Sequence, residues 1–262
     1  MQLVALNLDG VLLDDSFGPV IHRFVVERGL TWSPQAEQVV LSQSPSGAVE
    51  ALGLGGSPTD VVGEFFRMRE AWVREHPVRV AGGVGALLGR LRALGVQVVC
   101  YGGLGRQHFD RYLSGFAGLF DGPGYVCTAD FRPGLREIAE EVFSIGGEHV
   151  LFIDDVARVA EAARGLGAAF IGRPSSSEHS FQRELMVRAG VRHMVDSLEE
   201  IDGRLLRRVD EEAADGRLWP ASTASAAGYT DVPLPPETTS DTAPPDGLGV
   251  KGLSAVADTA GC

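Results

Sequence analysis

Short apolar runs alternate with amphipathic stretches along the first two thirds of the chain. Four segments have the spacing of amphipathic helices, namely 84–95, 105–116, 134–145 and 156–167, and the last ends at a glycine, a common helix stop. Five other runs are short, mostly apolar and flanked by Gly or Asp, as buried strands are. These are VALNL (4–8), VQVVCY (96–101), YVCTA (125–129), VLFID (150–154) and AAFIG (168–172).

This alternation predicts an α/β fold. Strands that alternate with helices form right-handed βαβ units, which build a doubly wound parallel sheet with both faces covered. Open sheets of this kind bind ligands at the carboxyl ends of their strands. The residues that follow each strand are therefore where a functional site is expected.

One interval of about seventy residues breaks the alternation. It lies between the first strand and the helix at 84–95, and it carries two helical patterns, GPVIHRFVVERGL and PTDVVGEFFRMREAWVREH. We predict a helical cap at 16–82, inserted over the strand ends, and an α/β core made of 1–15 and 83–213.

The composition changes again near Trp219, where Pro, Ser, Thr, Ala and Gly replace large apolar residues. Such a segment cannot bury enough apolar surface to offset the entropy of ordering, so we predict a disordered tail over 214–262, with a short docking motif as the weaker alternative. The preceding segment, 197–217, is acidic and arginine-rich. It predicts a solvated amphipathic helix, and a pairing role is the alternative.

Charge and composition exclude several function classes. The 262 residues carry a net charge of −12, which argues against nucleic acid or an anionic membrane as a main partner. The sequence shows neither a signal-peptide pattern nor an apolar stretch long enough to span a bilayer. Its three cysteines are widely spaced, so we expect a cytoplasmic protein without a disulfide framework or a zinc site. Oligomeric state is not predicted.

Polar residues follow four of the predicted strands. Acidic side chains in such a cluster suit Mg²⁺, which prefers oxygen ligands. A glycine turn that opens a helix offers N–H groups to phosphate, and an arginine offers a bidentate fork for the same oxygens. The residues are Asn7, Asp9 and Gly10, then Tyr101, Gly102 and Gly103, then Arg132, and finally Asp154 and Asp155.

Four segments in order resemble the haloacid dehalogenase (HAD) superfamily of phosphatases and related hydrolases. LNLDGVLLD is similar to the family's strand followed by DxDGTxxD, and HPVRVAGGVGALLGRLRALGVQVVCYGG leads into its second motif. RPGLREIAEEV resembles the segment that begins with its third-motif lysine and proline, and VLFIDDVARVAEAARGLG resembles its fourth motif. The resemblance covers about 2–172 and implies a HAD-like, Rossmann-type core with an inserted cap.

The resemblance also implies site roles. In the family, a first-motif Asp attacks phosphorus and forms an aspartyl-phosphate, and a second Asp serves as acid and base. Asp9 matches the second Asp, and its backbone carbonyl is a metal ligand in the family. Asp155 matches the metal-binding Asp, with Asp154 before it, and Arg132 matches the phosphate-binding lysine. Tyr101, Gly102 and Gly103 fall at the phosphate-binding second motif. Mg²⁺ is the implied cofactor, and the implied substrate is a small phosphorylated metabolite.

The sequence departs from this pattern at its most important position. Asn7 replaces the nucleophilic Asp, Tyr101 or Gly102 stands where a small hydroxyl is expected, and Val159 lies where a further Asp or Asn is often found. An amide is not a nucleophile for a phosphate ester, and one carboxylate fewer weakens a Mg²⁺ site. Arg132 stands in place of the family's third-motif lysine and keeps its positive charge.

Four interpretations remain. The favoured one is a HAD-like phosphatase-type protein in which catalysis is reduced or lost. An active hydrolase would need metal-bound water with Asp9 as base, or deamidation of Asn7. The alternative class is a non-catalytic phosphate-ligand-binding or regulatory protein. A purely structural interpretation treats Asp9 and Asp154 as turn and capping residues. The six histidines are scattered, and each is expected to lie on the surface or to pack.

Overall fold

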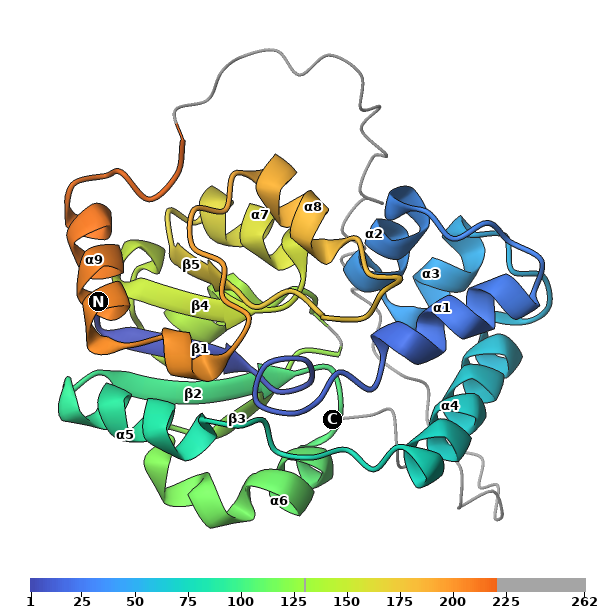
Figure 1. Cartoon of the computed structure of the whole chain (residues 1–262), viewed down its shortest axis with the longest axis horizontal. Helices are drawn as coiled ribbons and strands as arrows, with labels where there is room; N and C mark the ends of the chain where they lie inside the picture. Colours follow the sequence, from blue (N-terminus) through green and yellow to red (C-terminus); the bar gives the residue numbers. More distant parts are fainter. Residues whose placement is uncertain (130, 221–262) are drawn as a thin grey trace, which may run out of the picture.

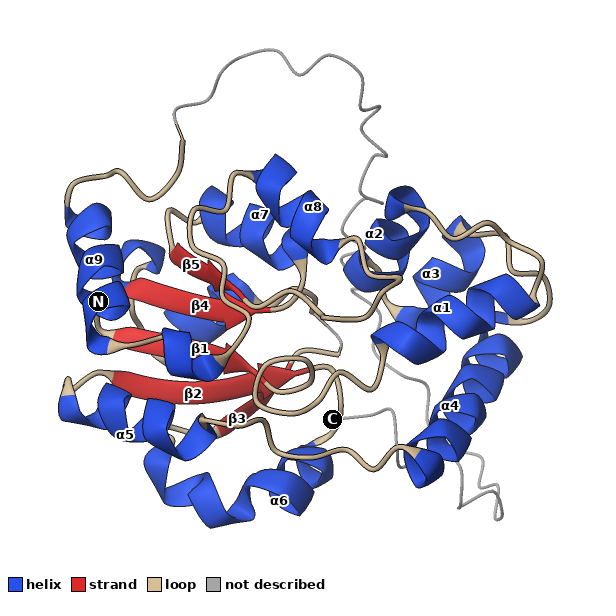
Figure 2. Cartoon of the chain, viewed as in Figure 1, coloured by secondary structure: helices blue, strands red, loops and turns tan. Residues whose placement is uncertain are grey.

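The computed structural model describes residues 1–129 and 131–220 of the chain. Its centre is a five-stranded parallel sheet in the order β3-β2-β1-β4-β5, shown in red in Figure 2. The predicted doubly wound fold is confirmed, and the third strand is shorter than expected. The strands are β1 (Leu3–Asn7), β2 (Gln97–Gly102), β3 (Tyr125–Cys127), β4 (Val150–Asp154) and β5 (Ala169–Gly172).

Helices cover both faces of the sheet (Figure 1). Successive strand residues point to opposite faces, so Val4 and Leu6 pack on one side, and Leu3 and Ala5 on the other. The first side is covered by α5 (Val84–Ala93), α6 (Arg106–Leu113) and α9 (Gly203–Ala214). The second is covered by α7 (Ala157–Gly165), α8 (Gln182–Ala189) and a π-helical turn, Glu137–Val142.

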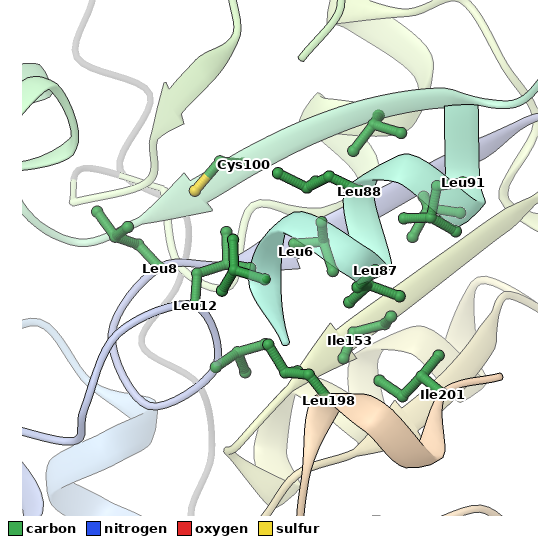
Figure 3. Packing of buried hydrophobic residues seen from close by; sticks show 14 of the residues in the cluster. Leu6, Leu8, Leu12, Leu87, Leu88, Leu91, Cys100, Ile153, Leu198 and Ile201 are labelled. Atoms are coloured by element: carbon green, nitrogen blue, oxygen red, sulfur yellow. The ribbon is translucent and has the colours of Figure 1, made fainter. Parts of the chain in front are cut away.

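The larger apolar cluster lies between α5 and the sheet (Figure 3). Leu87, Leu88 and Leu91 of α5 and Leu6 of β1 are each 0% exposed. Burying a leucine side chain contributes about 1.5–3 kcal/mol. This cluster fixes the position of β1, and therefore of the polar residues at its carboxyl end.

Four helices occupy the predicted insert. They are α1 (Gly18–Glu27), α2 (Pro34–Ser42), α3 (Pro45–Ala51) and α4 (Pro58–Glu75). A proline lies in the first turn of each, where its missing N–H costs nothing. A small cluster of Phe24, Val49 and Val61 holds α1, α3 and α4 together, and Figure 1 shows the four helices beyond the carboxyl ends of the strands.

Helix boundaries differ from the sequence prediction in three places. The segment predicted at 134–145 forms the π-helical turn, and the helix predicted at 105–116 is α6 followed by a 3₁₀ helix, Ser114–Leu119. The single helix predicted over 197–217 is divided into a 3₁₀ turn, Leu198–Glu200, and α9. The division has a local cause, because the Asp202 carboxylate accepts the N–H groups that begin α9.

The start of the predicted tail packs on the core. Trp219 donates its indole N–H to the carbonyl of Ala168 at 3.1 Å, and its ring lies 6.5 Å from that of Phe170. The rest of the predicted tail, 221–262, is outside the described residues. Within 1–129 and 131–220, no helix combines the length and apolar character needed to cross a bilayer.

Candidate functional site

A cavity of about 400 Å³ lies between the carboxyl ends of the strands and the cap helices. Several predicted site residues come together on its surface, namely Asn7, Asp9, Gly103, Arg132 and Asp155. Tyr101, Gly102 and Asp154 instead line a smaller pocket of about 70 Å³ beside Asn7 and Arg132. The parallel sheet produces this arrangement, because all its strands end at the same edge.

Asn7 is joined to the end of β4 by its side chain. Its amide Nδ2 donates to Asp154 Oδ2 at 2.7 Å, and the phenol of Tyr101 donates to the same oxygen at 2.5 Å. The other oxygen of Asp154 accepts the N–H of Val156 at 2.8 Å. Both oxygens of Asp154 are therefore engaged in hydrogen bonds within the protein.

This arrangement changes the roles predicted for two residues. Tyr101 is 2% exposed and its hydroxyl is directed at Asp154, so it supports the site from within the core instead of lining the larger cavity. Asp154 is 0% exposed. Its bond to the N–H of Val156 forms a turn after β4, which is the role that the purely structural interpretation gave to this residue. Burial raises the pKa of Asp154, while the bonds from Tyr101 and Asn7 oppose that shift.

Asp155 lies against the backbone of the first loop. A Cβ atom placed on Gly10 would lie 2.1 Å from Asp155 Oδ2, so only glycine fits at this position, where φ is +85°. Burial, and then the nearby charges of Asp154 and Asp15, raise the pKa of Asp155 well above its ordinary value. A partly buried carboxyl close to other carboxyls is a position where a cation binds favourably.

Asp9 contacts two basic side chains from different parts of the chain. Its Oδ1 lies 2.9 Å from Nε2 of His108 on α6 and 3.9 Å from a guanidinium nitrogen of Arg69 on α4. Arg69 also donates to Ser16 at 2.6 Å and lies over the ring of Phe17. Burial lowers the pKa of Arg69, and the charge of Asp9 opposes that effect. Asp9 is thus a contact point between core and cap.

Arg132 is held against the glycine turn that follows β2. A Cβ atom on Gly103 would lie 1.7 Å from Arg132 Nη2, so the turn accommodates the guanidinium only because residue 103 is glycine. Protein atoms crowd the Arg132 guanidinium, although the residue remains accessible to solvent. The resulting desolvation lowers the pKa of Arg132, and the negative charge of Asp154 opposes this shift. Arg132 forms no ion pair within 4.0 Å with a described residue, which leaves its charge available to an anion.

These residues fit Mg²⁺ in part. Asp155 provides a hard carboxylate oxygen close to other acidic groups, as the ion requires. Asp154 does not fit as a ligand, because hydrogen bonds engage both of its oxygens. Over 1–129 and 131–220, no cluster of three or more His, Cys, Asp or Glu residues is placed to hold a metal. The set suits an ion that also takes ligands from water and phosphate.

Two residues of the site, His108 and Arg69, were not predicted. His108 was expected to be a surface or packed residue, and Arg69 was assigned no role. His108 lies in the first turn of the helix that follows β2, and that placement at the sheet edge was a usable signal. Arg69 lies four residues after Phe65 on α4, as a lone cation on an apolar stripe. Asp15 accepts the N–H groups of Phe17 and Gly18 and the hydroxyl of Ser175, so it joins the cap to the core.

Comparison with solved structures identifies the fold. An HAD hydrolase (family IA, variant 3) from Entamoeba histolytica aligns with a TM-score of 0.60 at 16% identity, over 80% of this chain and 100% of that chain. An HAD family hydrolase from Deinococcus radiodurans, solved with bound phosphate and sodium, aligns with a TM-score of 0.53 at 21% identity, over 85% and 99% of the two chains.

A third structure is CbbY from Rhodobacter sphaeroides, in a variant with asparagine in place of an aspartate and in complex with xylulose-(1,5)bisphosphate. It aligns with a TM-score of 0.55 at 12% identity, over 77% of this chain and 96% of that chain. No protein-family model and no curated protein matches the sequence. At these identities the similarities show that this chain has the HAD-like, Rossmann-type fold.

Proposed function

We propose that this protein binds a small phosphorylated metabolite at the cavity under the cap and turns it over slowly or not at all. The proposal places a phosphatase-type site of the HAD kind on the residues described above. In this assignment Arg132 and the N–H groups near Gly103 bind phosphate. Asp9 takes the acid and base position, and Asn7 takes the position of the nucleophile.

The observation that carries the proposal is the hydrogen bond from Asn7 to Asp154. A carboxylate at position 7 would have a free oxygen for attack on phosphorus, whereas an amide nitrogen that donates to Asp154 at 2.7 Å has no such capacity. Removing the nucleophile of an unrelated hydrolase lowers the rate about 10⁶-fold and leaves roughly 10³–10⁴ over water. Residual turnover at that level is compatible with a binding role.

The residues that recognise phosphate are retained, which supports binding over complete loss of the site. Arg132 presents a cation without an ion-pair partner among the described residues, and it lines the cavity together with Gly103 and Asp155. Mg²⁺, when bound, would neutralise phosphate charge, with Asp155 as its carboxylate ligand. Because Asp154 is engaged elsewhere, we expect the ion to bind weakly alone and more tightly together with phosphate.

Two of the similar structures support this assignment. The Deinococcus radiodurans protein holds phosphate and sodium, and the CbbY variant holds xylulose-(1,5)bisphosphate although an asparagine replaces an aspartate. These two proteins hold phosphate or a phosphorylated ligand, and we extend that property to this chain as part of the proposal.

The test is equilibrium binding. Inorganic phosphate and Mg²⁺, added separately and together, are titrated into the full chain while thermal unfolding is followed. We expect the two together to raise the melting temperature by more than the sum of their separate effects. If phosphate and Mg²⁺ leave the melting temperature unchanged, both separately and together, the assignment of a phosphate site is contradicted.

A further inference from the structure

We infer that the ligand is a phosphate monoester with an apolar body, an alkyl or aryl phosphate rather than a sugar phosphate. This inference rests on the proposed function and adds the substrate class. It follows from the difference between the two ends of the cavity. The sheet end carries Arg132, Asp9 and Asp155, and the cap end is lined by aromatic and aliphatic side chains.

The cap end of the cavity is formed by the four cap helices, which turn apolar side chains toward it. Its apolar side chains include Ile21, Phe24 and Val25 from α1, Leu41 from α2, and Val62 and Phe65 from α4. The rings pack on one another, since Phe65 lies 5.5 Å from Phe24 and 5.4 Å from Phe66 between centroids. An apolar group placed here would leave water for a surface of matching chemistry.

Most polar side chains that line the cavity are already engaged in building the cap. Asp15 accepts the N–H groups of Phe17 and Gly18 and the hydroxyl of Ser175. Glu37, which is 3% exposed, accepts the hydroxyl of Ser180 and the N–H of Phe181.

Other polar lining residues lie at the junction of α2 and α3, where Ser44 and Ser46 are exposed. Ser44 accepts the N–H of Gly47 at 3.2 Å, and Gln43 lies beside it at the junction of α2 and α3. Gln182 accepts the N–H of Ala157, and its Nε2 is the one buried amide nitrogen of the described lining without a partner. Within the buried part of the described lining, this one free donor cannot replace the water around the several hydroxyls of a sugar. Each unsatisfied buried hydroxyl costs about 1–3 kcal/mol.

The size of the cavity fits this class of ligand. Its volume of about 400 Å³ lies in the range of small-molecule sites, which are mostly apolar with a few placed polar groups. The cation of Arg132 at one end orients the phosphate. The body of the ester then extends toward Phe24 and Phe65.

The experiment is a homologous series. Affinities of the full chain are measured by calorimetry in the presence of Mg²⁺ for ethyl, butyl and hexyl phosphate, phenyl phosphate, glucose 6-phosphate and inorganic phosphate. Burial of a methylene is worth up to about fourfold in affinity. We expect affinity to rise from ethyl to hexyl phosphate by at least tenfold, and phenyl phosphate to bind at least tenfold more tightly than glucose 6-phosphate.

Variants at Val62 locate the effect. Val62→Phe shortens the cavity, so affinity should stop rising at a shorter chain, while inorganic phosphate binds as before. Val62→Thr keeps the shape and adds a hydroxyl, so it should weaken hexyl phosphate several-fold even if the larger substitution fails to fold. Val187→Thr on α8, where the side chain is 60% exposed, is the matched control and should change nothing.

The outcomes separate the two claims. If phosphate binds but affinity does not change with chain length, or glucose 6-phosphate binds as tightly as hexyl phosphate, the apolar substrate class is wrong and the proposed function stands. If neither phosphate nor any ester binds, the proposed function fails, and the substrate class fails with it. A chain-length dependence that Val62→Thr leaves unchanged would place the apolar contact outside this cavity and would overturn the inference.

Discussion

The amide of Asn7 and the carboxylate of Asp154 are joined by a hydrogen bond of 2.7 Å between the ends of neighbouring strands. This bond satisfies an oxygen of the buried Asp154 carboxyl with a donor that an ionised aspartate at position 7 would not supply. The same bond occupies an oxygen that a metal would otherwise use. Under the proposed function, asparagine at position 7 would stabilise the metal-free protein and weaken the proposed Mg²⁺ site.

The first prediction concerns Asn7→Asp. In metal-free buffer the substitution places a carboxylate against Asp154, whose pKa burial already raises. We expect the free energy of unfolding to fall by about 1–3 kcal/mol at neutral pH, and Mg²⁺ to restore most of the loss. Denaturant unfolding with and without Mg²⁺ measures this. Asn7→Ser is the control, because it loses the hydrogen bond without adding a charge and should not regain stability with Mg²⁺.

The second prediction concerns Tyr101→Phe, which removes a donor from Asp154 Oδ2. Without this donor the pKa of Asp154 rises further above its unfolded value. The variant should therefore lose less stability near pH 4, where more of the native carboxyl is protonated, than near pH 8, where we expect a loss of about 1–3 kcal/mol. Tyr125→Phe is the matched control, since that hydroxyl donates to the carbonyl of Leu104 at 2.5 Å. A loss of equal size at both pH values for Tyr101→Phe would contradict the account.

The third prediction concerns Arg132→Gln. The guanidinium forms no ion pair with a described residue, so its removal should change the free energy of unfolding by no more than about 0.5 kcal/mol. Stabilisation by phosphate, which is about 2.7 kcal/mol at a concentration of 100 Kd, should disappear. Arg136→Gln is the control, because that side chain is exposed and lies outside the cavity lining. Equal loss of the phosphate response in both variants would show that the effect is nonspecific.

The fourth prediction concerns His108, whose Nε2 contacts Asp9 Oδ1 at 2.9 Å. If Asn7→Asp restores turnover, adding His108→Gln should lower kcat about tenfold while KM changes little, because the substitution affects Asp9 and not the phosphate ligands. His149→Gln, at an exposed position, is the control. An increase in KM without a change in kcat would assign His108 to binding instead.

The sequence predicted the sheet because its signals are local. The apolar runs at 4–8 and 150–154 are short, and the buried strands β1 and β4 coincide with them to within a residue. Placement of Asn7, Asp9 and Asp155 at one edge followed from parallel topology alone. Helix boundaries such as the one at Asp202 depend on a single capping side chain, and the periodicity of apolar residues does not reveal such a boundary.

The rest of the site depends on contacts between distant segments. Arg69 reaches Asp9 across sixty residues of chain, and Tyr101 reaches Asp154 across fifty-three. No spacing rule connects such pairs. Tyr101 was therefore assigned to ligand binding from its place at the carboxyl end of its strand, although its hydroxyl donates to the buried carboxyl of Asp154.

The most direct test of the central claim is phosphate release from a panel of phosphate monoesters, with Mg²⁺, by the native chain and by Asn7→Asp. Mass analysis of the peptide that contains residue 7 confirms that the asparagine is intact. We expect the native protein to release phosphate slowly or not at detectable rates, and Asn7→Asp to release it at least a hundredfold faster. Rapid turnover by the native protein with Asn7 intact would contradict the account and would require a different nucleophile.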